Sequence, residues 1–260
     1  MSAAVPGWAG VIASMSLVAL TAVVAWRRRL RLGREVTFAA VRAGVQLAAV
    51  GAILLLVFEH TGLAGAFAWL AAMTLIAGQV AGRRARGLPR ARLTATTAVA
   101  VGTAATLGVL LVLEVIDARP RVVIPVGGMV VSGAMQFTAL VLIRLRDEAR
   151  TARLQVEARL ALGLSAADAF APHLRSALRT ALVPVIDSTK TVGLISLPGA
   201  MTGLILAGVD PFTAIRYQIV VMYMLLAASA LAVLTAARLT ERVLFDDAHR
   251  LRPLPDQSPI

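Results

Sequence analysis

Residues Val122 to Ile143 read VVIPVGGMVVSGAMQFTALVLI, a run of 22 positions without a charged side chain. A helix of this length rises about 33 Å, which is enough to cross the roughly 30 Å of hydrocarbon in a bilayer. Arg121 comes directly before the run and Arg144 directly after it. An uncharged run of this length between two arginines predicts a transmembrane helix.

Runs of this kind recur along the chain, in which 58% of the 260 residues are hydrophobic and only 15% are charged. That apolar share exceeds the share in ordinary globular domains. Seven runs are long enough to span a membrane: 7–26, 36–58, 63–82, 93–116, 122–143, 191–209 and 212–237. The sequence therefore predicts an all-α, polytopic membrane protein of about seven transmembrane helices, in one domain over 1–250. The tail 251–260 holds three prolines, and we expect it to be disordered.

Arginines are distributed unevenly among the loops that join these runs. They cluster at 27–34 and 83–92, whereas the loops at 59–61 and 117–121 carry at most two positive charges. Because cytoplasmic loops are enriched in Lys and Arg, we expect a multi-pass protein of the cytoplasmic (inner) membrane, with its N-terminus outside and its C-terminus inside. Seven arginines and Lys190 then predict that the segment between the fifth and sixth runs is cytoplasmic. The formal charge of +12 comes from these arginine clusters. No aromatic residues that could stack on bases are interleaved with the arginines, so we expect no nucleic-acid binding.

Residues 144–184, between the fifth and sixth runs, are amphipathic but too charged to cross a bilayer. Gly163 predicts the left-handed end of a first helix, and Ser165 with Asp168 has the form of a capping box that opens a second, short helix. We therefore expect a helix, a tight turn and a helix that project into the cytoplasm. Phe170 lies on the short element, which offers little core to bury it, so we expect an exposed aromatic side chain that binds a partner. A solvated amphipathic linker is the alternative.

Polar groups inside the runs are candidates for a substrate path, because they are costly in lipid. Pro198 should kink or break the sixth run and free backbone carbonyls, as in the discontinuous helices of transporter sites; a kink that serves only packing is the alternative. Arg42 and Gln46 lie four residues apart on one face of the second run. Arg42 either lines a path or snorkels to the cytoplasmic boundary.

Thioethers and other polar groups complete the candidate path. Methionine sulfur can contact a soft metal ion, but methionine is also ordinary apolar filler, so the sequence assigns no metal site. These further candidates are Met129, Met135, Gln136, Met201 and Thr202.

The sequence carries no enzyme motif that we can identify. Its one lysine, Lys190, has no glycine-rich phosphate-binding loop before it. The histidines at 60, 173 and 249 lie outside the predicted spans and far apart in sequence, so they form no metalloprotease motif. We therefore expect a chain that is not an enzyme and holds no cofactor of its own. A secondary transporter and a scaffold without transport activity are the alternatives to an ATP-driven transporter.

Several segments resemble one known family of transport proteins. Residues 157–170 read EARLALGLSAADAF and resemble the EAA loop of ABC permeases, whose coupling helix docks on a nucleotide-binding subunit. The segments IPVGGM at 124–129 and LPGAMTG at 197–203 are similar to those of the FetB (YbbM) family of ABC permeases. The resemblance implies an all-helical membrane subunit, paired as a homodimer, with a FetA-type ATPase that binds the ATP. It also implies a link to iron export, and plant relatives connected to aluminium tolerance. The resemblance assigns contact with the ATPase to Glu157, Gly163, Ser165, Asp168 and Phe170.

Overall fold

A computed structural model describes residues 7–28, 33–195, 197–246 and 248–255. Apart from isolated bridge residues, among them the pair Phe245 and Leu251, regular structure in these residues is helical. Six of the helices, α1, α2, α3, α4, α5 and α9, are long and apolar enough to cross a membrane. The described helices are α1 (Trp8–Arg27), α2 (Gly33–His60), α3 (Gly62–Arg84), α4 (Ala91–Val112), α5 (Pro120–Thr151), α6 (Arg153–Ala161), α7 (Ala166–Thr191), α8 (Gly199–Leu206) and α9 (Pro211–Leu244). The all-α, polytopic prediction is confirmed.

The predicted sixth span, 191–209, is wrong as a single helix. Instead α7 continues to Thr191, and the backbone is then extended at Val192 and again at Pro198, with Gly193 at φ +83° between them. Pro198 caps α8, which has only eight residues and rises about 12 Å. The break predicted at Pro198 is therefore real, but it separates two helices, and neither α7 nor α8 is among the six candidate spans.

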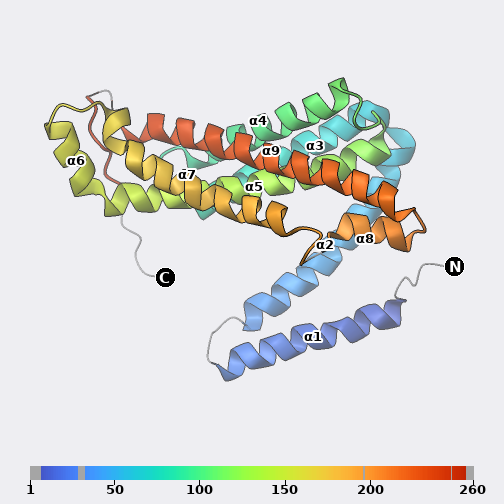
Figure 1. Cartoon of the computed structure of the whole chain (residues 1–260). Coiled ribbons are helices and arrows are strands. Elements are labelled where there is room, and N and C mark those ends of the chain that lie inside the picture. The colour runs from blue at the N-terminus through green and yellow to red at the C-terminus, as the bar shows by residue number, and fades with distance from the viewer. Residues whose placement is uncertain (1–6, 29–32, 196, 247, 256–260) are drawn as a thin grey trace.

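Helices α5 and α9 run in the same direction along each other (Figure 1). Near the end of α5, Glu148 contacts His173 at the start of α7; just beyond α9, Phe245 contacts Phe170 on the same turn of α7. Because both helices run toward this end, the chain must return between them. That return is made by α7 and α8 together, and the two helices occupy the place where one continuous span was predicted.

Small residues bring the helices of the α3–α9 bundle into close contact. A Cβ atom on Gly102 of α4 would lie 2.7 Å from the carbonyl oxygen of Ala228 and 2.9 Å from the Cβ of Ala232, both on α9. A Cβ atom on Gly82 of α3 would likewise lie 2.5 Å from the Cα atom of Arg92 on α4. Lipid provides no hydrophobic drive for helix association, so van der Waals packing of such small residues holds the bundle together.

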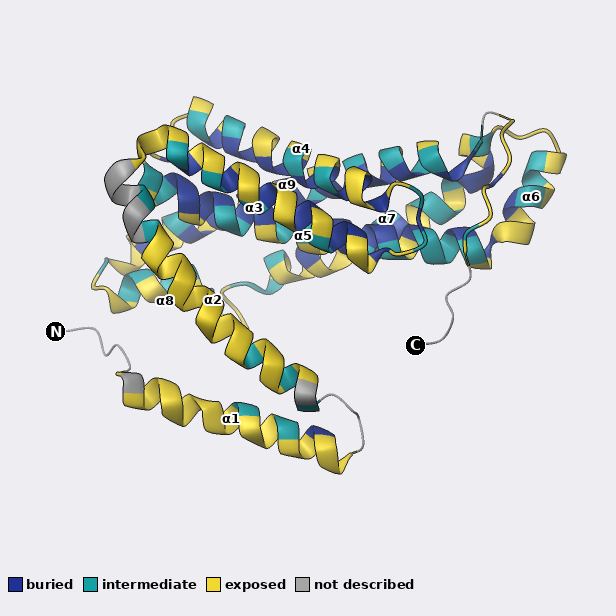
Figure 2. Ribbon diagram, turned by 180° about the vertical axis from the view of Figure 1, so that it is seen from behind, coloured by how far each residue is buried: buried dark blue, intermediate teal, exposed yellow. Residues whose placement is uncertain are grey.

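Helices α1 and α2 extend away from this bundle (Figure 1), and most of their surface is exposed (Figure 2). Arg42 and Gln46 are both exposed on α2. The structure therefore places these two residues apart from the other predicted path residues.

The arginine-rich turn between α3 and α4 lies at the same end of the bundle as the end of α5. Arg146 of α5 donates a hydrogen bond from Nη1 to the carbonyl oxygen of Arg86, at 3.1 Å. The chain continues from α9 into this end, where Leu251 is 5% exposed and Leu254 packs against the core. Disorder is thus the wrong prediction for 251–255, because these leucines reach a core the sequence does not reveal, and 256–260 lie outside the described residues.

Candidate functional site

The predicted helix, turn and helix are present as a hairpin of α6 and α7. Gly163 adopts φ +88° between them, a conformation that glycine takes without steric strain. The Ser165 Oγ accepts the backbone N–H of Asp168 at 3.1 Å and donates to Asp168 Oδ2 at 2.6 Å. The cap is confirmed, but the second helix is not short: α7 has 26 residues and contains both Pro172 and Pro184.

Phe170 does not have the exposed position predicted for it. It has no exposed surface and is the largest fully buried side chain of the described residues. Its ring centroid lies 6.1 Å from that of Phe245, edge to face, and 5.9 Å from that of His173. Because α7 is long enough to pack on both α5 and α9, it places Phe170 in a core that a short helix would not have. Phe170 therefore holds the hairpin to α9, and its side chain is not available to a partner.

Two exposed apolar residues of the hairpin lie at its turn. Leu162 is 81% exposed and Leu164 is 40% exposed, on either side of Gly163. Leu154, at the start of α6, is also 81% exposed. A small apolar tip on a charged hairpin is the kind of surface that marks a protein contact.

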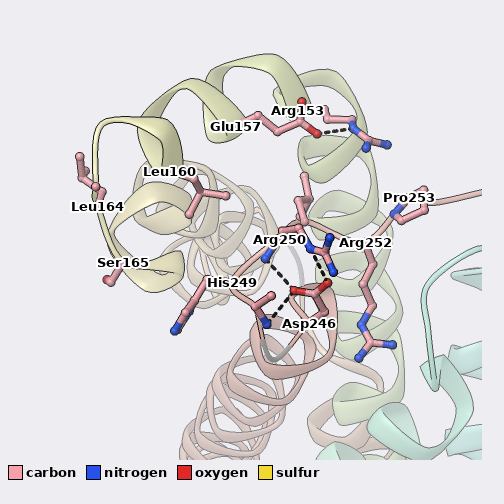
Figure 3. A pocket seen from close by; sticks show the side chains of 13 residues that line it. Arg153, Glu157, Leu160, Leu164, Ser165, Asp246, His249, Arg250, Arg252 and Pro253 are labelled. Carbon is pink, nitrogen blue, oxygen red and sulfur yellow. Dashed lines mark hydrogen bonds and ion pairs between the residues drawn. The ribbon is translucent and has the colours of Figure 1, made fainter.

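A cavity of about 940 Å³ lies between this hairpin and the segment that follows α9 (Figure 3). Two ion pairs border it: Arg153 Nε to Glu157 Oε1 at 2.7 Å, and Arg250 Nε to Asp246 Oδ2 at 3.0 Å. A backbone hydrogen bond from Arg250 holds the pKa of the Asp246 carboxyl below its usual value. The lining residues are Arg153, Glu157, Leu160, Gly163, Leu164, Ser165, Asp246, Ala248, His249, Arg250, Leu251, Arg252 and Pro253.

The base of the hairpin is fixed to α5 by a polar cluster. His173 Nδ1 lies 3.0 Å from Glu148 Oε2, and the Ser176 hydroxyl donates to Glu148 Oε1 at 2.9 Å. Together with Phe170, which lies three residues before His173, these contacts connect α7 to both α5 and α9. The hairpin is therefore fixed to the bundle by packed side chains and hydrogen bonds.

A second hollow, the membrane cavity, lies within the bundle, where α7 ends and the chain breaks before α8. It consists of two adjoining cavities of about 890 and 510 Å³, which share Thr189, Val192, Leu197, Pro198 and Met222. The larger lies between α5, α7 and α9, and the smaller between the break and α9. The other polar and sulfur-bearing residues of their lining are Met129, Ser132, Gln136, Ser188, Met201, Gln218, Tyr223 and Ser229.

Two buried polar atoms in this membrane cavity have no hydrogen-bond partner among the described residues. They are the Oε1 of Gln218, a residue that is 5% exposed, and the Oγ of Ser229, which is fully buried. An unpaired buried oxygen is costly unless water or a ligand contacts it. The lining contains no Asp, Glu, His, Lys or Arg, and the described part of the chain has no group of three or more His, Cys, Asp or Glu side chains placed to hold a metal ion.

The membrane cavity collects only part of the predicted path. Met129 and Gln136 line its larger part, Met201 lines its smaller part, and Pro198 borders both. Met135 instead packs against the cores that α5 forms with α3, α4 and α9. Thr202 donates to the Pro198 carbonyl oxygen at 3.1 Å within the first turn of α8. The predicted pathway positions of Met135 and Thr202 are not supported by this geometry.

The hydroxyl groups of the cavity were not predicted from the sequence. Ser188 and Thr189 fall in the segment predicted to be cytoplasmic, and Ser132 and Ser229 are small residues inside apolar runs. Only the course of α7 into the bundle makes them neighbours. A serine inside an apolar run can indicate a polar site, but such serines are too common in transmembrane helices to single out Ser132 and Ser229.

Comparison with known proteins identifies relatives over almost the whole chain. It is 40% identical over 240 residues to the UPF0014 membrane protein STAR2 of Oryza sativa subsp. japonica, covering 92% of this chain and 84% of that protein. It is 36% identical over 240 residues to the protein ALUMINUM SENSITIVE 3 of Arabidopsis thaliana, covering 92% and 88%. It is 34% identical over 238 residues to the probable iron export permease protein FetB of Escherichia coli (strain K12), covering 92% of each chain.

No solved structure matches the chain significantly. The resemblance to FetB inferred from sequence motifs is confirmed by this similarity. The model of the family described as "Uncharacterised protein family (UPF0014)" matches residues 8–245, which include both the hairpin and the membrane cavity. This multi-pass membrane protein therefore belongs to the UPF0014 family.

Proposed function

We propose that the chain is the membrane-spanning permease subunit of an ATP-driven ABC transporter, and that a separate subunit binds and hydrolyses the ATP. The α6–α7 hairpin carries the proposal. It closes at the arginine-rich end of the bundle and exposes an apolar tip at Leu162 and Leu164, while Phe170 fixes its base to α9. A hairpin built in this way can transmit a movement imposed by a partner subunit to α5 and α9, the helices that line the membrane cavity. The permease name of the FetB relative supports the same function.

The arrangement of charge supports an orientation for this subunit. The α3–α4 turn and the end of α5, both rich in arginine, lie together and so belong on the cytoplasmic side. The N-terminus is then outside the cytoplasmic membrane and the C-terminus inside. We also propose that two copies of the chain enclose one pathway, because an ABC transporter requires paired membrane domains. A secondary transporter would use the same cavity but would need no ATPase partner.

Replacement of both Leu162 and Leu164 by aspartate should abolish association with the ATPase. Charged side chains would then occupy the apolar contact, and loss of hot-spot contacts typically costs about 2 kcal/mol or more. Both leucines are exposed, so the permease itself should fold. The measurement is recovery of the ATPase with the affinity-tagged permease, which we expect to fall at least about tenfold.

Leu154→Asp provides the matched control, because this leucine is as exposed as Leu162 but lies at the other end of α6. It should leave recovery of the ATPase nearly unchanged. Equal loss in the control would place the contact elsewhere on the hairpin. Absence of any ATPase in purifications of the unaltered chain would instead favour a secondary transporter.

We propose a metal cation such as iron as the substrate and export as the direction. The support is the name of the FetB relative, together with thioether and amide groups along the membrane cavity. Such ligands bind a cation weakly enough to release it. The double substitution Met129→Ala, Met201→Ala should therefore raise cell-associated iron, and sensitivity to iron with peroxide, toward the levels of cells without the permease.

Met135→Ala is the control for this experiment, since Met135 is on the same helix as Met129 but does not line the cavity. It should retain export if the protein accumulates normally. Unchanged iron in cells that lack the whole permease would exclude iron as the substrate, without affecting the assignment as a permease.

A further inference from the structure

One face of α7 carries opposite charges near its C-terminal end. Val183, Ile186, Asp187 and Lys190 follow the spacing of a single helix face, and all four are exposed. Asp187 Oδ1 lies 3.7 Å from Lys190 Nζ, and the two side chains are 59% and 70% exposed. In the sequence, this lysine is one of the positive charges that predict a cytoplasmic segment between the fifth and sixth runs. The packing of α7 gives it a different depth.

The depth follows from the register of α7 against α5. Ser132 lies in the middle of the uncharged run of 22 residues on α5, so it is about 17 Å from the arginine at either end. Ser132 lines the same cavity as Ser188 and Thr189 of α7. The contact of His173 with Glu148 fixes the level more closely, because α7 runs back along α5 from that contact. Asp187 and Lys190, 14 and 17 residues beyond His173, therefore lie about level with residues 134 and 131 of α5, near the middle of its span.

The α9 helix gives the same depth independently. Its uncharged run extends from 217 to 237, and Ser229 lies close to the middle of this run. The Ser229 Oγ is 3.5 Å from the Cβ position built on Gly133, next to Ser132. Since both spans place their centres at this level, Asp187 and Lys190 lie near the middle of the membrane.

Charged side chains at this depth do not face lipid; they face protein or a water-filled cavity. The charged face of α7 is self-complementary, because it bears one acid and one base that a two-fold axis can bring opposite each other. A second copy of the chain can thus pair its Lys190 with Asp187 of the first. Exposed Leu194 and Ile195, just beyond α7, extend this surface with apolar contacts.

We infer that the α7 face of Asp187 and Lys190 lines a water-filled pathway between two copies of this chain, and that Asp187 binds the cation in transit. The inference rests on the proposed permease function and adds a residue to its site. The membrane cavity offers only neutral oxygen and sulfur ligands, whereas a divalent cation in a low-dielectric region requires negative charge nearby. One Asp187 carboxylate from each copy supplies it, and Lys190 occupies the carboxylate when no cation is bound.

Cysteine labelling tests the pathway without any transport measurement, because the chain has no cysteine of its own. Ile186→Cys places a thiol on the charged face and leaves Asp187 intact. Val101→Cys is the control: Val101 is 42% exposed against 39% for Ile186, and it adjoins Gly102, which packs on Ala228 near the middle of α9. In vesicles treated on both sides, a charged, membrane-impermeant thiosulfonate should modify Ile186→Cys and not Val101→Cys.

A bifunctional maleimide should also join two Ile186→Cys chains into a species of twice the mass, with no such product from Val101→Cys. Equal labelling of the two variants would overturn the inference. Labelling without cross-linking would overturn it too, since the water would then not lie between two copies.

Asp187→Asn tests the role of the carboxylate. It should reduce metal export by about tenfold or more, the effect of losing one charged contact, while recovery of the ATPase stays normal. Asp117→Asn, an exposed acid in the α4–α5 connection, should leave export unchanged. Normal export by Asp187→Asn would overturn the proposed cation contact. Failure to recover any ATPase with the unaltered chain would refute the proposed function instead. The labelling and cross-linking results would still test the pathway between two copies, because they do not depend on an ATPase.

Discussion

Phe170→Ala is expected to destabilise the hairpin end of the protein by about 3 to 5 kcal/mol, the usual cost of emptying a buried phenylalanine site. Phe170 has no exposed surface and contacts Phe245 and His173 from two sides. The site cannot collapse easily, because α5, α7 and α9 are held together by further contacts, including that of His173 with Glu148. Thermal unfolding of the purified protein in detergent measures the loss.

Phe212→Ala is the matched control, since Phe212 is 76% exposed at the start of α9. Its effect on stability should stay within about 0.5 kcal/mol, as for most surface substitutions. Equal stability of Phe170→Ala and the unaltered chain would contradict the buried position of Phe170. Reduced ATPase recovery by a stable Phe170→Ala protein would point back to the exposed anchor expected from the sequence.

Gly102→Ala should destabilise the bundle by about 1 to 3 kcal/mol, although alanine is normally the better helix former. The added Cβ would overlap the carbonyl oxygen of Ala228 at 2.7 Å and the Cβ of Ala232 at 2.9 Å. Both belong to the packed face of α9, so relief requires the separation of α4 from α9. The readout is the unfolding temperature of the purified protein in detergent.

Gly108→Ala, on the same helix, should have the opposite effect. Beyond the adjoining backbone of its own helix, no heavy atom lies within 4 Å of the Cβ position at Gly108. The substitution should therefore stabilise α4 by up to about 1 kcal/mol through helix propensity alone. Effects of the same sign in the two variants would show that the α4–α9 contact is looser than described.

Local chemistry in the sequence predicted the turn of the hairpin correctly. Gly163 at positive φ and Ser165 capping the N–H of Asp168 depend on residues at most three positions apart. Pro198 acts locally in the same sense, because its fixed φ and missing N–H suit the residue that caps the start of α8. Of the predicted path, Met129, Gln136 and Met201 reach the cavity because they flank the break before α8 or face it from α5.

The sequence by itself determined that the chain is a helical membrane protein with basic ends to its spans, because the length of an apolar run and the charges beside it are one-dimensional properties. Only the tertiary structure decided where α7 lies. Its packing along α5 and α9 buries Phe170 and brings Ser188 and Thr189 to a cavity that Ser132 of α5 also lines, although all three residues of α7 were assigned to a cytoplasmic segment. A helix as polar as α7 can enter the bundle because neighbouring helices, rather than lipid, surround part of its surface, and no property of its own sequence reveals those neighbours.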